Sequence, residues 1–328
     1  MNDSPEVSVV MSVYNGADHL RQTMDSILAQ EGVSFEVVIV NDGSTDQSAK
    51  ILGEYANRDE RVRVFQQENQ GLTRSLIKGC SEAQGKYIAR HDVGDISDPK
   101  RLLLQKSTLD ETRDLVFVSS WTEFCGPQWE HLYVFKGTGQ AALPVDIISE
   151  PEENGTIDGP TSHPSVMFRK DFYGMAGGYR SEFYYGQDWD LWYRLAELGK
   201  FQTIERILYK ARILPDSITM KQTARQKAIS ALSVKALRRR ARGLSEEPVL
   251  TEAKLIRPKQ PKIHEGNAGA AGLYFIGECL RRNGDHRALA YFKKAISNSP
   301  FLIKAWVRIL QHKVSPNKKR IPTALSVE

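Results

Sequence analysis

Residues 35–46 read FEVVIVNDGSTD, and this stretch decides the fold. Its first six residues are apolar apart from one glutamate, which predicts a strand buried in a sheet. The run NDGS predicts a turn, and Thr45 and Asp46 can cap a helix that carries Ile51 and Leu52 on its apolar side. A buried strand, a polar turn and a capped helix form one unit of an α/β fold.

The same unit recurs on both sides of this stretch. Residues 7–13 and 62–65 predict further buried strands, each followed by a helical pattern, and residues 87–89 predict a fourth strand. This alternation predicts a doubly wound, mostly parallel, Rossmann-like sheet with right-handed crossovers. We expect this domain to span residues 1–216. Its remaining elements are a helix from Pro99, strands at 115–119, 163–168, 201–204 and 208–211, an irregular loop over 121–159 and an amphipathic helix at 187–198.

The composition changes after this domain. Residues 217–245 predict a basic helix, and residues 246–266, which contain three prolines, predict a linker. Residues 267–328 predict a C-terminal helical appendage. Apolar spacing within the appendage resembles one partial tetratricopeptide-type repeat, and a plain helical hairpin is the alternative.

The overall composition excludes several classes of protein. The chain has 328 residues, of which 41% are hydrophobic, and this is enough for a large core. A net charge of +5 is too small to indicate a nucleic-acid partner, and we expect none. The three cysteines are far apart and form no Cys-x-x-Cys pair, which argues against a zinc site or a disulfide framework. Residues 1–6 are polar and no apolar run approaches about 20 residues, so we expect a cytoplasmic protein.

Positive charge gathers in residues 221–242 and again at Lys318, Lys319 and Arg320. Apolar residues are interleaved with the first basic group, which is typical of a helix lying on a membrane surface. The pattern therefore predicts a peripheral contact with the inner face of the membrane through residues 221–242. A solvated helix packed on the main domain is the alternative.

Carboxylates follow two of the predicted strands, where open α/β sheets bind their ligands. Asp42 can accept the ring N–H of a pyrimidine, and Gly43 lets the backbone approach closely; an ordinary turn is the alternative. Asp92 and Asp95 lie close together in sequence and predict a site for Mn²⁺ or Mg²⁺, because hard cations prefer oxygen ligands. A helix cap is the alternative for Asp95.

A third carboxylate, Asp188, lies at the start of the predicted helix over 187–198. We expect the helix N-terminus to keep this carboxylate ionised, as a general base requires, and simple capping is the alternative. His163 and Trp189 are candidates for the acceptor side of the site, and a structural role is the alternative for both. These three carboxylate sites together indicate group transfer from a nucleotide-activated donor.

The order of motifs resembles family 2 of the inverting nucleotide-sugar glycosyltransferases, which have the GT-A fold. The resemblance covers roughly residues 7–215, consistent with one large domain. It rests on the runs VVMSVYN at 9–15, VNDGSTD at 40–46, NQGLT at 69–73, GKYIAR at 85–90, DVGD at 92–95, HP at 163–164 and DWDLW at 188–192.

The resemblance implies a role for each matching residue. Nucleotide and donor binding falls to Ser12, Tyr14, Asn15, Asp42, Gly43, Asn69, Gly71, Arg90 and Asp92, with Asp42 on the base, which we expect to be uracil. The metal falls to Asp92 and Asp95, and the general base is Asp188. The family's Asp-x-Asp pattern is broken here by Gly94, and Gln187 replaces the usual glutamate before Asp188.

The expected reaction is a single displacement with inversion, in which Asp188 takes the proton of an acceptor hydroxyl on a glycan or lipid-linked glycan. One alternative is a non-catalytic sugar-nucleotide-binding or scaffold protein, which the break at Gly94 favours. A sugar nucleotidyltransferase is a further alternative, but the N-terminal region has no glycine-rich loop followed by a basic residue.

Overall fold

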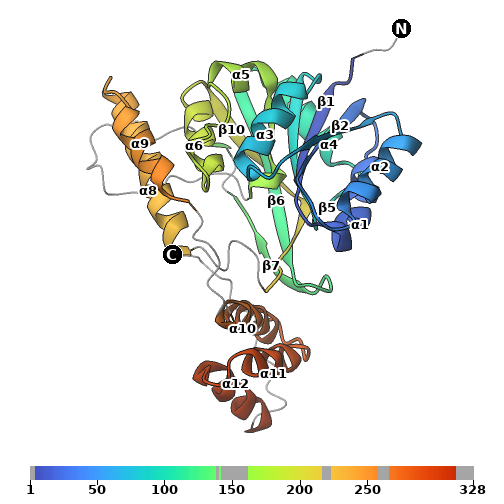
Figure 1. Cartoon of the computed structure of the whole chain (residues 1–328), viewed down its shortest axis with the longest axis vertical. Coiled ribbons are helices and arrows are strands. Elements are labelled where there is room, and N and C mark those ends of the chain that lie inside the picture. The colour runs from blue at the N-terminus through green and yellow to red at the C-terminus, as the bar shows by residue number, and fades with distance from the viewer. Residues whose placement is uncertain (1–3, 138–139, 142–161, 216–222, 258–265, 315–328) are drawn as a thin grey trace. The chain divides into compact units, whose positions relative to one another are not determined.

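The computed structural model describes residues 4–137, 140–141, 162–215, 223–257 and 266–314. The chain divides into two compact units. The first comprises Met1–Thr122, Phe135–Ala211 and Ala224–Arg257, and the second comprises Glu123–Val134, Arg212–Thr223 and Pro258–Glu328. Figure 1 labels the helices and strands of the chain, and those of the first unit position the candidate site described below.

One sheet runs through the first unit in the order β3-β2-β1-β4-β9-β6-β10-β5. Its strands are β1 (Val7–Val13), β2 (Phe35–Asp42), β3 (Val62–Gln67), β4 (Tyr87–Asp92), β5 (Ile96–Ser97), β6 (Leu115–Cys125), β9 (Met167–Arg169) and β10 (Lys200–Arg212), and β7 (His131–Phe135) and β8 (Gln140–Ala141) pair with β6 and β10. The helices are α1 (Ala17–Leu28), α2 (Ser48–Arg58), α3 (Leu72–Glu82), α4 (Arg101–Glu111), α5 (Lys170–Met175), α6 (Gln187–Ala196), α8 (Thr223–Ala241) and α9 (Glu247–Leu255).

The predicted α/β fold is confirmed, with a sheet that is parallel at one end. Strands β3, β2, β1 and β4 are parallel neighbours, whereas β9 runs antiparallel to both β4 and β6. Within the register Val13 pairs with Asn41, and Ser12 pairs with Asp92. The carboxyl ends of β1, β2 and β4 therefore meet at one edge of the sheet.

Two layers of helices cover the two faces of this sheet because strand side chains alternate in direction. Val9 and Met11 point into a cluster that contains the apolar residues of α1, α2 and α4. Val10 and Val38 point the other way, into a cluster with residues of α3 and α6. All four side chains are fully buried, so the parallel strands read as near-continuous apolar runs.

Two predictions of irregular structure were wrong. We expected residues 121–159 to form a loop, but β6 continues to Cys125 and pairs with β7 after a short turn; residues 142–161 lie outside the described part. We also expected a linker over 246–266, but residues 247–255 form α9. Its Pro248 lies in the first turn, where the missing N–H costs no helical hydrogen bond.

Helix α8 packs within the first unit. Ile229, Leu232 and Leu237 are buried, the first two in a cluster with Phe183 and Tyr185. Because these apolar side chains are already covered by protein, the structure favours the alternative of a helix packed on the main domain. No helix in the described ranges is both long and apolar enough to cross a bilayer.

In its described residues the second unit contains three helices, α10 (Gly266–Arg282), α11 (Ala288–Asn298) and α12 (Ile303–Val314). Ile276 and Leu280 of α10, Phe292 of α11 and Ala305 of α12 share one buried cluster. Gly277 lets the first two helices pack closely, since a Cβ there would lie 2.7 Å from the Phe292 ring. The predicted C-terminal helical region is therefore present, with its own core.

Candidate active site

The loops after β1 and β2 are joined by hydrogen bonds at the edge of the sheet. Asn15 Oδ1 accepts from the backbone N–H of Thr45 at 2.8 Å, and the Asn15 N–H donates to Ser44 Oγ at 3.0 Å. Asn15 has a positive φ of 49°, a conformation that asparagine tolerates better than most residues. Next to it, Tyr14 is 54% exposed, so its ring is free to lie against a ligand at this edge.

Asp42 is buried at the end of β2 and holds the adjacent loop in place. Its Oδ1 accepts from the Gln67 side chain at 2.7 Å and from the Gln70 N–H at 2.9 Å, and its Oδ2 accepts from the Gly71 N–H at 2.8 Å. A carboxylate offers about four acceptor positions, so Asp42 has capacity for one further donor. The predicted neighbours Asp42 and Gly71 are therefore brought together.

Glycines allow the backbone segments to approach each other here. Gly43 has a φ of 72°, and a Cβ on it would lie 2.7 Å from the backbone nitrogen of Asn69. Gly71 has a φ of 87°, and a Cβ there would lie 2.8 Å from the Tyr184 ring. Both positions need glycine for conformation and for space.

Arg90 is fully buried and connects the next strand to the site. It donates to the carbonyls of Val10 and His91, both at 2.9 Å, and forms an ion pair with Asp92. The Asp92 side chain is 37% exposed, so a ligand can reach it. Arg90 thus holds Asp92 at the edge where β1, β2 and β4 end.

His163 lies behind Arg90. Its Nε2 accepts from Tyr179 Oη at 2.7 Å and from Arg90 Nε at 3.3 Å, which is the arrangement of a neutral ring. Burial, together with the Arg90 charge, holds the pKa of His163 well below its usual range. Because Nε2 is engaged inside the protein, this geometry favours the structural alternative over contact with an acceptor.

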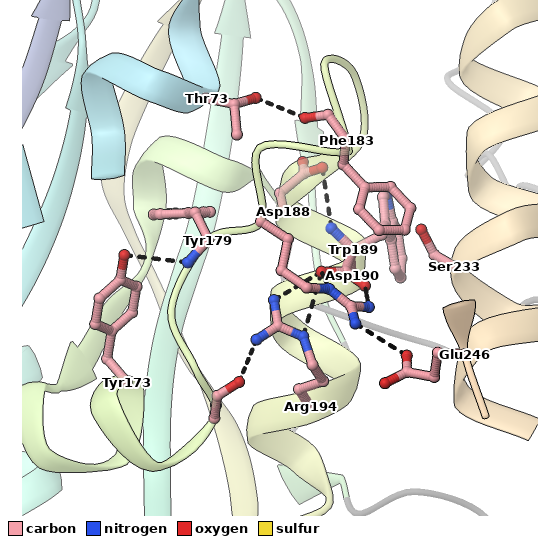
Figure 2. A network of polar contacts seen from close by, with 12 residues as sticks. Thr73, Tyr173, Tyr179, Phe183, Asp188, Trp189, Asp190, Arg194, Ser233 and Glu246 are labelled. Carbon is pink, nitrogen blue, oxygen red and sulfur yellow. Dashed lines mark hydrogen bonds and ion pairs between the residues drawn. The ribbon is translucent and has the colours of Figure 1, made fainter. Parts of the chain in front are cut away.

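Asp188 lies in the first turn of α6 and is partly exposed (Figure 2). Its Oδ1 accepts from the Trp189 N–H at 3.0 Å. Burial raises the pKa of Asp188 to about 6, although the Trp189 hydrogen bond and the Arg90 charge act in the opposite direction. We expected the helix N-terminus to keep this carboxylate fully ionised, but loss of solvent is the larger effect. Asp188 therefore changes protonation near neutral pH.

The two residues that follow Asp188 have structural contacts. Trp189 packs against Trp192 and Tyr193, with ring centroids 5.1 Å and 5.8 Å apart. Asp190 is buried and pairs with Arg180 and Arg194 (Figure 2). These contacts hold the first turn of α6 rigid and so fix where Asp188 lies.

The two predicted metal ligands have different surroundings. Asp95 is only 7% exposed and accepts from Tyr209 Oη at 2.9 Å, whereas Asp92 is the more accessible carboxylate. Across the described part of the chain, no group of three or more His, Cys, Asp or Glu side chains forms a metal site. One accessible carboxylate fits the way Mg²⁺ is held in sites where substrate phosphates supply further ligands.

Sequence analysis missed two buried residues that support the site. Arg101 of α4 donates to the carbonyls of Arg90 and Pro164, at 2.8 Å and 2.9 Å. Tyr209 of β10 accepts from the Asp92 N–H at 3.2 Å. An arginine beside Leu102 on an otherwise buried helix side was the only signal in the sequence, and Tyr209 gave none.

Solved structures with the same fold cover nearly the whole chain. Staphylococcus aureus TarS 1–349 in complex with UDP-GlcNAc has a TM-score of 0.52 at 16% identity, covering 96% of this chain and 93% of that one. The mannosyltransferase PcManGT from Pyrobaculum calidifontis, in complex with GDP-Man and Mn²⁺, has a TM-score of 0.51 at 15% identity, covering 95% and 86%. Together with the sheet order, these likenesses define a protein of the GT-A fold.

The family follows from sequence comparison. The model of glycosyl transferase family 2 matches residues 8–172. The putative glycosyltransferase EpsE of Bacillus subtilis is 33% identical over 218 residues, which are 65% of this chain and 74% of EpsE. The chain belongs to glycosyl transferase family 2.

Proposed function

We propose that this protein is an inverting glycosyltransferase that moves a sugar from a UDP-sugar to a hydroxyl of a glycan or lipid-linked glycan, with Asp188 as general base. The observation that carries this proposal is the electrostatic setting of Asp188. Its carboxylate is held on a rigid helix, its pKa is raised to about 6, and the charges of Arg90 and Asp92 both act on it. A base with a pKa near the working pH is effective in proton transfer.

The proposed transfer takes place in a single displacement step. The acceptor oxygen forms a bond to the anomeric carbon, and the bond from that carbon to the diphosphate oxygen breaks. Asp188 takes the hydroxyl proton as the new bond forms. Because attack and departure occur on opposite sides of the carbon, an α-linked donor gives a β-linked product.

The remaining site residues bind the donor. Asp42 has an acceptor position for the ring N–H of uracil, and Tyr14 is exposed to lie against the nucleoside. The backbone of Gly71 donates to Asp42 and that of Asn69 lies against Gly43, so both can line the donor site. Arg90 supplies buried positive charge near Asp92, which favours the diphosphate. Ser12 lies opposite Asp92 in the β1–β4 register and completes the donor side.

Asp92 would hold a divalent cation, with Asp95 behind it as the second carboxylate. A bound Mn²⁺ or Mg²⁺ supplies positive charge for the diphosphate of the donor. Two structural neighbours support a nucleotide-sugar donor, because TarS 1–349 is in complex with UDP-GlcNAc and PcManGT is in complex with GDP-Man and Mn²⁺. UDP is favoured over GDP here because Asp42 has one acceptor position left. Uracil offers a single N3–H, whereas guanine offers N1–H and an adjacent amino group, which together suit a carboxylate with two free positions.

A thermal-shift titration tests the donor site. UDP and GDP are added to the full chain with Mn²⁺ or with EDTA, and a ligand that binds only the folded state raises the melting temperature. We expect UDP to raise it more than GDP, with most of the UDP shift lost in EDTA and in Asp92→Asn. Asp110→Asn, which changes a carboxylate beside Lys86 and Lys106, is the matched control and should keep the shift. No shift with either nucleotide in folded protein would favour the non-catalytic alternative.

A further inference from the structure

Helix α12 has two apolar faces. One packs into the second unit through Ala305 and Ile309. The other is exposed and consists of Ile303, Trp306, Val307 and Leu310, at 74%, 48%, 42% and 58% exposure, with Phe301 just before the helix at 93%. We call these five residues the α12 stripe. The helical spacing of three and four places the last four on one side, so the stripe is a continuous patch rather than scattered residues.

The described helices of the second unit carry an excess of positive charge, and Lys304 lies on α12 between stripe residues. Within the sequence of residues 266–314 the acidic residues are Glu278 and Asp285, and both are already engaged: Glu278 pairs with Arg281 and Arg308, and Asp285 pairs with Arg287. Lys293, Lys294 and Lys304 are exposed. The unit therefore offers an apolar patch in a basic setting.

This combination identifies the chemistry of the partner. Helices that present tryptophan and aliphatic side chains beside lysines are typical of the interface of anionic membranes. A second copy of this chain would bring two basic units together, which like-charge repulsion opposes. We propose that the α12 stripe inserts into the surface of an anionic lipid bilayer, with Lys304 at the lipid phosphates.

The proposal also moves the membrane contact predicted from sequence. In α8 the apolar residues are buried by protein, whereas in α12 they are exposed. Charge does not show which of the two helices contacts the membrane, since both are basic. The exposed apolar face is present on α12, so we assign the contact to α12. The proposal is independent of the sugar-transfer reaction.

Co-sedimentation of the full chain with vesicles tests it. One set of vesicles is phosphatidylcholine alone, and the other contains about a third phosphatidylglycerol. The stripe variant Ile303→Ser/Val307→Ser/Leu310→Ser is compared with Met175→Ser/Leu244→Ser/Leu255→Ser, which changes three exposed apolar residues elsewhere. We expect the wild type and this control to bind anionic vesicles, and the stripe variant to bind at least about ten-fold more weakly. Lys304→Glu should also weaken binding, and high salt should do the same.

Three outcomes would overturn the proposal. They are a wild type that does not bind anionic vesicles, a stripe variant that binds as well as the wild type, and equal binding to neutral vesicles. Sedimentation equilibrium tests whether a second copy of this chain covers the stripe instead. A wild-type dimer that becomes a monomer in the stripe variant would assign the stripe to that second copy. Circular dichroism and the UDP-induced thermal shift, measured on the same samples, show that the fold and the donor site are intact.

Discussion

Asp188 and Asp190 are two residues apart on α6 but have opposite surroundings. Asp190 is neutralised by Arg180 and Arg194, and its task is to hold the helix. Asp188 forms no ion pair with the residues that the structure describes, and burial raises its pKa to about 6. This difference in surroundings is the reason that we propose Asp188, and not Asp190, as the base.

Asp188→Asn should lower kcat by about 100-fold to 10,000-fold, the usual contribution of a general base. Asparagine keeps the oxygen that accepts from the Trp189 N–H, so the helix start is preserved. In the wild type the rate should rise with pH through about 6, as the carboxylate loses its proton. Steady-state rates between pH 5 and 8 check this. A variant that keeps the wild-type rate and the same acid limb would exclude Asp188 as the base.

The same substitution should stabilise the protein at neutral pH. Folding raises the pKa of Asp188 above its ordinary value of 3.8, so the folded state loses stability as pH rises from about 4 to about 6. Asparagine removes this penalty. The melting temperature of Asp188→Asn minus that of the wild type should be near zero below pH 4 and positive above pH 6. A difference that is negative at pH 7 would indicate that the carboxylate stabilises the fold instead.

The sequence located the strand-end residues correctly because parallel strands bring their carboxyl ends to one edge. Asp42 and Asp92 could be placed in this way, whereas Ser12 was named only by the family resemblance. Tyr209 could not, since it reaches Asp92 from a strand 117 residues away in sequence. Arg101 could not either, because a helical pattern does not reveal that its side chain turns back to the Arg90 carbonyl. The burial of His163 was likewise invisible, because nothing local to His163 encodes Arg90 and Tyr179 as its partners.

At the scale of elements, the entry into α3 depends on one glycine. Gly71 has φ 87° and ψ 164°, a region that only glycine adopts readily. Gly71→Ala should cost about 1–3 kcal/mol of unfolding free energy and weaken UDP binding, because its N–H holds Asp42. Gly53→Ala is the matched control: nothing lies within 4 Å of its Cβ, and inside α2 alanine should stabilise by about 0.5–1 kcal/mol. Urea denaturation measures both, and equal effects would refute the argument.

The packing of α8 is tested by replacing a buried leucine of α8 with alanine and comparing it with the same replacement at an exposed leucine of α9. Leu237 is 1% exposed and Leu255 is 79% exposed. Leu237→Ala should lower the free energy of unfolding by about 2–4 kcal/mol, and Leu255→Ala should change it by less than about 0.5 kcal/mol. A small loss at Leu237 in denaturant titrations would mean that α8 does not belong to the core of its unit.

Periodicity predicted α8 and the parallel strands, but not which face of α8 is covered. The covering residues, Phe183 and Tyr185, come from the loop before α6, and a helix pattern carries no information about such a partner. Helix α9 was missed for a local reason, since prolines around it indicated a linker although Pro248 is well placed in a first turn.

For the whole molecule, the sequence predicted an α/β domain followed by helices, and the structure has both. The division between them was harder to predict, because α8 and α9 belong to the unit that contains the sheet. Packing partners, rather than the composition of the helices, determine this assignment. The family is secure from the matched region, whereas the sugar and the acceptor depend on loops that include residues outside the described part.

The most direct test of the central claim is the configuration of the sugar that the protein first releases from an α-linked UDP-sugar, with water as acceptor. Proton NMR follows the anomeric signals before mutarotation mixes them. The wild type should release the β anomer first, and Asp188→Asn should release it at least about 100-fold more slowly while still binding UDP. An α anomer that appears first, or an unchanged rate in Asp188→Asn, would contradict inversion with Asp188 as the base.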